Sequence, residues 1–189
     1  MSNVLLLPVA AGLLAFLPFS TSPEARGVDY KLDRIRERRV PPGSAVLFTA
    51  HELNAWVAAE VPEYAPRGVR NTHLELGNGS VIGSAAIDFL KIRQAQGAET
   101  SWLMAKLIEG EHPVRVSARI QSRAGKATVH LEQVEISGMS VSGSTLDFLI
   151  SNFFRPLFPE AKIDQPFDLD DNVERIEIHP GVAKAVIKR

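Results

Sequence analysis

Alternating apolar and polar positions in the second half of the chain predict two long antiparallel strands. Between Val114 and Ile120, apolar side chains alternate with arginine and serine, the period-two pattern of a strand with one wet face. A turn at 123–126 reverses the chain. On the returning strand, the apolar positions change parity between Leu131 and Val134. We therefore expect a β-bulge near residues 132–133, which would also curve the sheet.

Two further hairpins are expected on either side of this pair. A Gly-Asn-Gly-Ser turn at 77–80 separates the apolar-rich runs 69–76 and 81–89. Near the end of the chain, a Pro-Gly turn joins 173–179 to 182–188. The sequence thus predicts three antiparallel hairpins.

Helical spacing appears between the hairpins. A short strand at 44–48 leads into a helix that opens with the capping box Thr49 to Glu52 and closes at Pro62. A shorter helix is expected over 99–108. The order hairpin, helix, hairpin, helix, hairpin predicts an α+β fold.

The clearest amphipathic helix runs from Ser144 to Phe158. Its apolar residues recur at i, i+3, i+4, i+7, i+8 and i+11, and Ser144 with Asp147 fits a capping box. Phe148 and Phe158 lie off this stripe, so the helix has more apolar surface than one buried face requires. It is either a core helix under the sheet or one wall of an apolar groove.

The N-terminal residues predict a targeting or anchoring segment. Val4–Phe19 is a sixteen-residue run without charge, between the lengths of a signal peptide and a membrane span. We assign residues 1–22 to a signal peptide or N-terminal membrane anchor, 23–43 to a charged linker and 44–189 to the folded domain. Pro23 disfavours cleavage after Ser22, so cleaved and tethered forms both stay open. Either places the domain in the periplasm or cell envelope, whereas the basic flank leaves a cytoplasm-facing anchor as the alternative.

The composition excludes several kinds of partner and of catalytic or metal site. The net charge is −1, from 21 basic and 22 acidic residues, which argues against nucleic acid as a partner. The absence of cysteine excludes disulfides, thiolate metal sites and a cysteine nucleophile. The five histidines lack metal-site spacing, and no phosphate-binding or nucleophile motif is complete. We expect no catalytic residues, no metal and no cofactor. The late aspartates fit a solvated acidic loop, with weak calcium binding as the alternative.

An apolar groove between the sheet and the 144–158 helix would hold lipid without special polar chemistry. The candidate lipid-binding residues are Leu146, Leu149, Ile150, Phe153, Phe154 and Leu157 on the helix and Val116 and Ile120 on the strand opposite. The arginines at 115, 119 and 123 either meet lipid phosphates or form a solvated sheet face.

Several segments together resemble a known family. They are the strand pair 114–136, the step ISGMSVSGSTLDFL into a helix, the closing segment NVERIEIHPGVAKAVIKR, and the earlier FTAHELNAWV and LELGNGSVIGSAAIDF. Over 44–189 this pattern resembles the LmeA-like family of periplasmic phospholipid-binding proteins, which is related in shape to tubular lipid-binding domains. The resemblance implies a strongly curved antiparallel sheet wrapped around two or three helices, here preceded by an N-terminal hydrophobic helix.

The leading hypothesis is a non-catalytic envelope protein that binds or transports lipid, either acyl chains or a polycyclic lipid. Its expected partners are lipid, a membrane reached through the N-terminal segment, and an envelope protein. The competing hypothesis is a structural or scaffolding protein that acts through protein–protein contacts. A closed, well-packed interior would favour the second hypothesis, and a continuous apolar cavity the first.

Overall fold

The computed structural model describes residues 22–64, 68–95, 97, 109–158 and 161–189. The hydrophobic helix expected within residues 1–22 and the short helix expected over 99–108 therefore lie outside the described residues. The described part is an α+β fold with antiparallel sheets, as the order of elements predicted.

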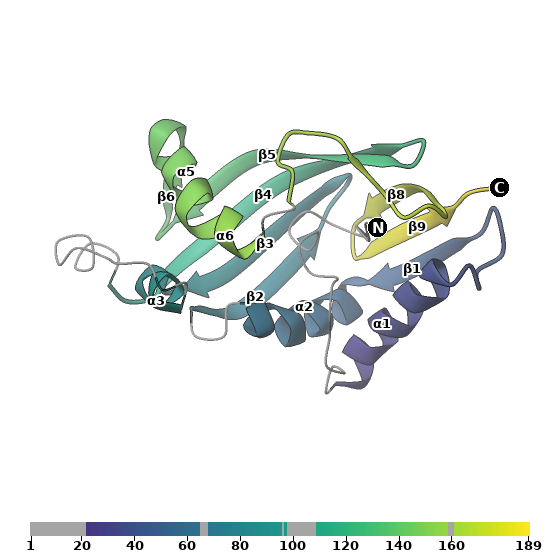
Figure 1. The fold of residues 1–189 in the computed structure, drawn as a ribbon, viewed down its shortest axis with the longest axis horizontal. Coiled ribbons are helices and arrows are strands. Elements are labelled where there is room, and N and C mark those ends of the chain that lie inside the picture. Colours follow the sequence, from purple (N-terminus) through teal and green to yellow (C-terminus); the bar gives the residue numbers. More distant parts are fainter. Residues whose placement is uncertain (1–21, 65–67, 96, 98–108, 159–160) are drawn as a thin grey trace.

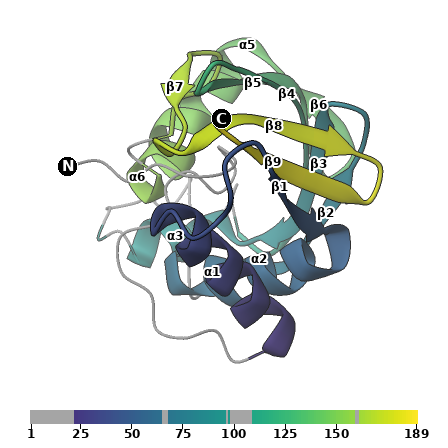
Figure 2. The same ribbon diagram turned by 90° about the vertical axis from the view of Figure 1, so that its right-hand side faces the viewer.

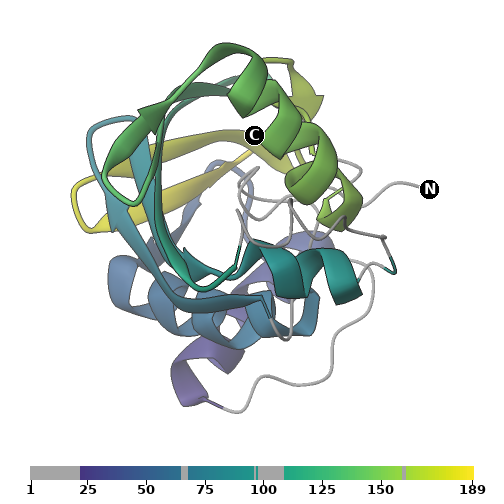
Figure 3. The ribbon, with the colours of Figure 1, turned by 90° about the vertical axis from the view of Figure 1, so that its left-hand side faces the viewer.

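The larger sheet has six strands, with β7 paired to β5 outside the path β2-β3-β4-β5-β6. The predicted hairpins join β2 to β3 and β4 to β5, and the sheet curls into an open trough (Figure 3). The strands are β2 (Val69–Leu76), β3 (Ser80–Ile87), β4 (His112–Arg123), β5 (Lys126–Ile136), β6 (Met139–Val141) and β7 (Phe167–Asp168).

A second sheet of three strands lies against one end of the first. Its order is β1 (Ala45–Thr49), β9 (Val182–Ile187) and β8 (Val173–His179) (Figures 1 and 2). The Ser122 hydroxyl of β4 donates to the Ile176 carbonyl at 2.6 Å and accepts from the Ile176 amide at 2.7 Å, which ties the two sheets together. The described antiparallel strands thus form two sheets instead of the single curved sheet that was expected, because the closing hairpin pairs with β1.

The predicted bulge is confirmed on β5. Ser117 pairs with Gln133 and Ala118 pairs with Leu131, so Glu132 is the extra residue. At the other end of the same pair, Ala124 and Gly125 have φ values of 52° and 75°. Two successive positive φ values are those of a tight turn that matches the twist of a hairpin.

The predicted capping box of α2 (Ala50–Tyr64) is also present. The Glu52 carboxylate accepts from the Thr49 amide at 2.9 Å, and the Thr49 hydroxyl accepts from the Glu52 amide at 3.2 Å. The helix runs to Tyr64, so the expectation that it closes at Pro62 is wrong by less than one turn.

The expected charged linker is wrong, because Pro23–Arg36 forms helix α1. Ser22 caps this helix by accepting from the Ala25 amide at 3.1 Å. The helix packs beside α2 (Figures 1 and 2), and the Trp56 indole of α2 donates to the Asp29 carboxylate at 2.8 Å. Its buried residues are Ala25, Val28, Leu32 and Ile35. The folded domain therefore includes helix α1, which the expected bounds of 44–189 left out.

The segment predicted as one helix at 144–158 has three parts. Helix α5 (Gly143–Leu149) passes into a π-helical turn over Ile150–Phe154 and then into α6 (Arg155–Leu157). The N-cap is Ser142, without a side-chain cap bond, so the expected Ser144 to Asp147 capping box is wrong. In Figure 3, α5 and α6 lie across the open side of the trough.

Helix α3 (Phe89–Ala95) was not predicted from the sequence. Asp88 caps it by accepting from the Lys91 amide at 3.0 Å, and Phe89 and Ile92 are buried. The sequence signal was present, since an aspartate precedes two large apolar residues spaced by three positions.

The buried apolar residues form two separate clusters. The large cluster joins α1, α2, both sheets and the closed end of the trough. The small cluster holds Phe89, Ile92, Val114 and Phe153 at the other end. The space between the clusters is the site described next.

Candidate functional site: an apolar cavity in the trough

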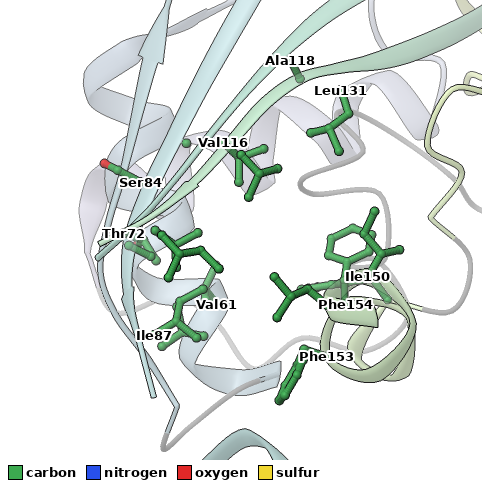
Figure 4. A pocket seen from close by; sticks show the side chains of 18 of the residues that line it. Val61, Thr72, Ser84, Ile87, Val116, Ala118, Leu131, Ile150, Phe153 and Phe154 are labelled. Carbon is green, nitrogen blue, oxygen red and sulfur yellow. The ribbon is translucent and has the colours of Figure 1, made fainter. Parts of the chain in front are cut away.

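A cavity of about 260 Å³ lies between the six-stranded sheet and the α5–α6 segment. Figure 4 shows Val61, Ile87 and Thr72 on one side, Val116 and Leu131 above, and side chains of the helical segment facing them. Residues of both clusters line the cavity, including Leu74 and Val129 of the large one. The cavity thus separates the packed end of the molecule from the small cluster.

Residues of four neighbouring strands, β2 to β5, form the sheet wall. Side chains alternate between the two faces of a strand, so every second residue of β3 and β4 lines the cavity. These residues are Gly83, Ala85 and Ile87 on β3 and Val114, Val116 and Ala118 on β4. Val81, the preceding inward position on β3, is buried in the large cluster and marks the closed end.

The bulge on β5 keeps both halves of this strand facing the cavity. Val129 and Leu131 lie before Glu132, Val134 and Ile136 lie after it, and all four line the space. Without the extra residue, one pair would point to the outer face, because a shift of one residue reverses every side chain that follows.

The helical wall is aromatic. The Phe153 ring lies 5.0 Å from the Phe89 ring and 6.1 Å from the Phe148 ring, both edge-on. Phe148 is 39% exposed and Phe153 only 4%, so the contacts run from the surface to the cavity wall. Aromatic pairs in this geometry add to the stabilisation from burial.

Small side chains on the sheet account for the empty space. A Cβ atom built on Gly83 would meet only the Leu74 Cδ2 atom, at 3.7 Å, an ordinary contact. Ala85 follows on the same wall, and Ala118 lies across from Val81. At Gly83 the backbone thus has room for a larger side chain than the sequence supplies.

The described cavity wall carries no aspartate, glutamate, lysine or arginine. Its polar members are Thr72, His73 and Ser84, and in Figure 4 the Ser84 hydroxyl points away from the space. Transfer of a charged group into such a site without a partner is unfavourable. The wall therefore suits hydrocarbon.

Charged side chains lie on helix α3 and at its N-terminus, next to the small cluster. The Lys91 ammonium is 2.7 Å from the Asp88 carboxylate, and the Arg93 guanidinium lies 6.0 Å from the Phe153 ring centroid. Burial acts to raise the pKa of Asp88, but hydrogen bonds from the side chain and backbone of Lys91 outweigh it and hold the pKa below the ordinary aspartate value. Asp88 is therefore a charged cap on α3 near neutral pH.

Most of the predicted lipid-binding residues meet at the cavity. Leu146, Leu149, Ile150, Phe153 and Phe154 line it from the helical segment, and Val116 lines it from β4. Ile120 is different: it packs against the large cluster and does not line the cavity, although its strand partner Val129 does. The side chain of Leu157 lies outside the described part of the structure.

The predicted site residues omitted the β2–β3 hairpin, together with the parts of the wall that β5, α2 and α3 provide. Gly83 and Ala85 were assigned to a strand without a functional role, since small residues there resemble weak strand positions. The usable signal was that two successive inward positions are small while their neighbours in the sheet are large.

The arginine series lies on the outer face of the sheet. Arg115 pairs with Glu75 at 3.4 Å, and Arg119 pairs with Glu132 at 2.8 Å. These contacts favour the solvated-face interpretation over a role at the lipid. In the late acidic segment, Asp168 pairs with Lys126 at 2.9 Å.

Within the described ranges, no group of three or more potential metal ligands comes together. Over the same residues, no helix has the length and apolar character needed to cross a membrane. No protein-family model matches the sequence, and the search of curated proteins gives no match.

Proposed function

We propose that this protein is a non-catalytic lipid-binding protein that holds hydrocarbon in the cavity between the six-stranded sheet and the α5–α6 segment. The observation that carries the proposal is an apolar cavity of about 260 Å³ without an aspartate, glutamate, lysine or arginine in its described wall. Binding sites for small apolar ligands are concave, mostly apolar and largely preformed.

The curved shape of the wall adds support. The bulge at Glu132 turns Val134 and Ile136 inward, and the helical segment lies across the open side of the trough (Figure 3). A strongly curved sheet that encloses helices and lipid is also what the resemblance to the LmeA-like family implies. The alternative of a scaffolding protein is less well supported, because its apolar residues would fill the interior.

The proposed setting is the periplasm or cell envelope, with the N-terminal segment as a cleaved signal or a retained anchor. This part of the proposal rests on the apolar run Val4–Phe19. In that setting the protein would carry lipid to or from a membrane. An envelope protein is a further proposed partner.

Solvent extraction of the purified protein, followed by mass spectrometry of the extract, tests the proposal. The matched variants are Ala85→Leu, which fills the cavity, and Ala86→Leu, which changes the next residue on the outer face of β3. We expect lipid with the wild type and with Ala86→Leu, and little with Ala85→Leu. Absence of lipid from the wild type, together with no transfer between vesicles, would contradict the proposal.

A further inference from the structure

On strand β3, the cavity lining ends at one residue. Along β3 the inward residues are Val81, Gly83, Ala85 and Ile87, and only the last three line the cavity. On β3, Gly83 is therefore the last lining position before the packed core, while Ala118, the partner of Val81, and Val129 continue the wall on β4 and β5. Its strand neighbours are Leu74 on β2 and Val116 on β4, both of which also line the space.

The chemistry of the wall limits what lies at that end. Leu74 and Ala118 are 5% and 3% exposed, and both belong to the large cluster. The residues around this end, Leu74, Val116 and Ala118, are apolar, and the described wall has no aspartate, glutamate, lysine or arginine, so a charged head group would lose its hydration there without gaining an ion-pair partner of these types. The end of a ligand that is next to Gly83 must therefore be hydrocarbon.

The size of the cavity limits how much hydrocarbon fits. Its volume of about 260 Å³ is slightly below the range of about 300–1,000 Å³ that is typical of pockets for drug-sized ligands. This volume favours one aliphatic chain over two. The other end of the cavity lies beside the half-exposed helix α5, which has no buried residue and leaves room for a head group in solvent.

We propose that the cavity takes a single aliphatic chain with its methyl end against Gly83, and that the missing side chain at Gly83 sets the longest chain that fits. The inference rests on the proposed lipid-binding function and names the ligand class of that site. The shared chemistry is one long hydrocarbon chain, whether it belongs to a free fatty acid or to a membrane lipid.

Substitutions at Gly83 can be graded without breaking the strand. The φ angle of Gly83 is outside the left-handed region, and an added Cβ makes only the 3.7 Å contact with Leu74. Gly83→Ala adds one methyl group and Gly83→Val adds an isopropyl group. Ala86→Val is the matched control, since Ala86 lies in a depression on the outer face with Arg115 and Glu135.

The test is calorimetric titration of each full-length variant with saturated fatty acids of increasing chain length. For the wild type, affinity rises with length up to a limit. For Gly83→Ala and then Gly83→Val, the limit moves to progressively shorter chains. For the longest chain, affinity falls about fourfold for each methylene displaced. Ala86→Val leaves the limit where it is, and thermal unfolding confirms that each variant is folded.

The outcomes are distinguishable. An equal loss of affinity at every chain length, or no change in either Gly83 variant, overturns the role of Gly83 while lipid binding stands. No binding by the wild type overturns the proposed function itself. A parallel titration with one-chain and two-chain phospholipids identifies the source of the chain, and uptake of both chains of a lipid into the cavity contradicts the single-chain inference.

Discussion

The two ends of the six-stranded sheet are packed differently. At one end, the sheet meets α1, α2 and the three-stranded sheet in a continuous buried cluster. At the other end, four buried residues hold α3 and the helical segment together, and a cavity separates them from the rest. The same curved sheet thus contributes to a close-packed core at one end and to the cavity at the other. The difference is made by small residues on the inner face, above all Gly83 and Ala85.

Because the two ends are packed differently, we expect substitutions at the packed end to cause the largest loss of unfolding free energy. Leu32 of α1 is 2% exposed, and Leu32→Ala should lower the free energy of unfolding by about 2–5 kcal/mol because it leaves a cavity in a close-packed core. Leu149 lines the hollow and is half-buried, so Leu149→Ala should cost less than about 2 kcal/mol. Urea unfolding measures both variants. Equal losses would show that the two ends do not differ in packing.

A smaller effect is expected where Asp88 holds the hollow end together. Asp88→Ala removes the cap of α3 and should lower stability by about 1 kcal/mol. Because the folded-state pKa of Asp88 is below its ordinary value, its stabilising effect is present near neutral pH and is lost as the pH falls through that folded-state pKa. Unfolding curves from neutral to acidic pH should therefore converge for the wild type and the variant. Parallel curves would assign the loss to something other than the Asp88 charge.

The smallest expected change in unfolding free energy is a gain in stability instead of a loss. Gly83→Ala should stabilise the ligand-free protein by about 0.4–1 kcal/mol, because it restricts the unfolded chain and its φ angle suits alanine. The same variant should bind long chains less tightly. Thermal unfolding of delipidated protein measures the first effect. A clear loss of stability would mean that the space beside Gly83 is already filled.

Some features of the fold could be predicted from the sequence, and others depend on tertiary packing. The bulge at Glu132 was predictable because it leaves a trace, a change of parity in apolar positions along one strand. Helix α1 was mistaken for a linker because its four buried positions stand among many charges, and only tertiary packing distinguishes such a helix from a solvated segment.

The hollow was harder to predict than its helical wall. Large apolar residues on the 144–158 segment were visible in the sequence, whereas a cavity depends on side chains that are small and on their neighbours across the sheet. The π-helical turn at Ile150–Phe154 was also invisible, because the apolar spacing there fits an ordinary α-helix equally well. Ile120 was misplaced since period-two alternation tells which face a residue occupies, but not where along that face the cavity ends.

The central claim is that hydrocarbon occupies the hollow end. Isotope-filtered nuclear Overhauser spectroscopy tests it directly, with labelled protein and an unlabelled saturated fatty acid. We expect contacts from the fatty acid chain to the methyl groups of Val116, Leu131 and Ile87, and none to Val28 or Leu32 in the packed core. Contacts confined to exposed surface residues such as Leu47, or no contacts at saturating ligand, would contradict it.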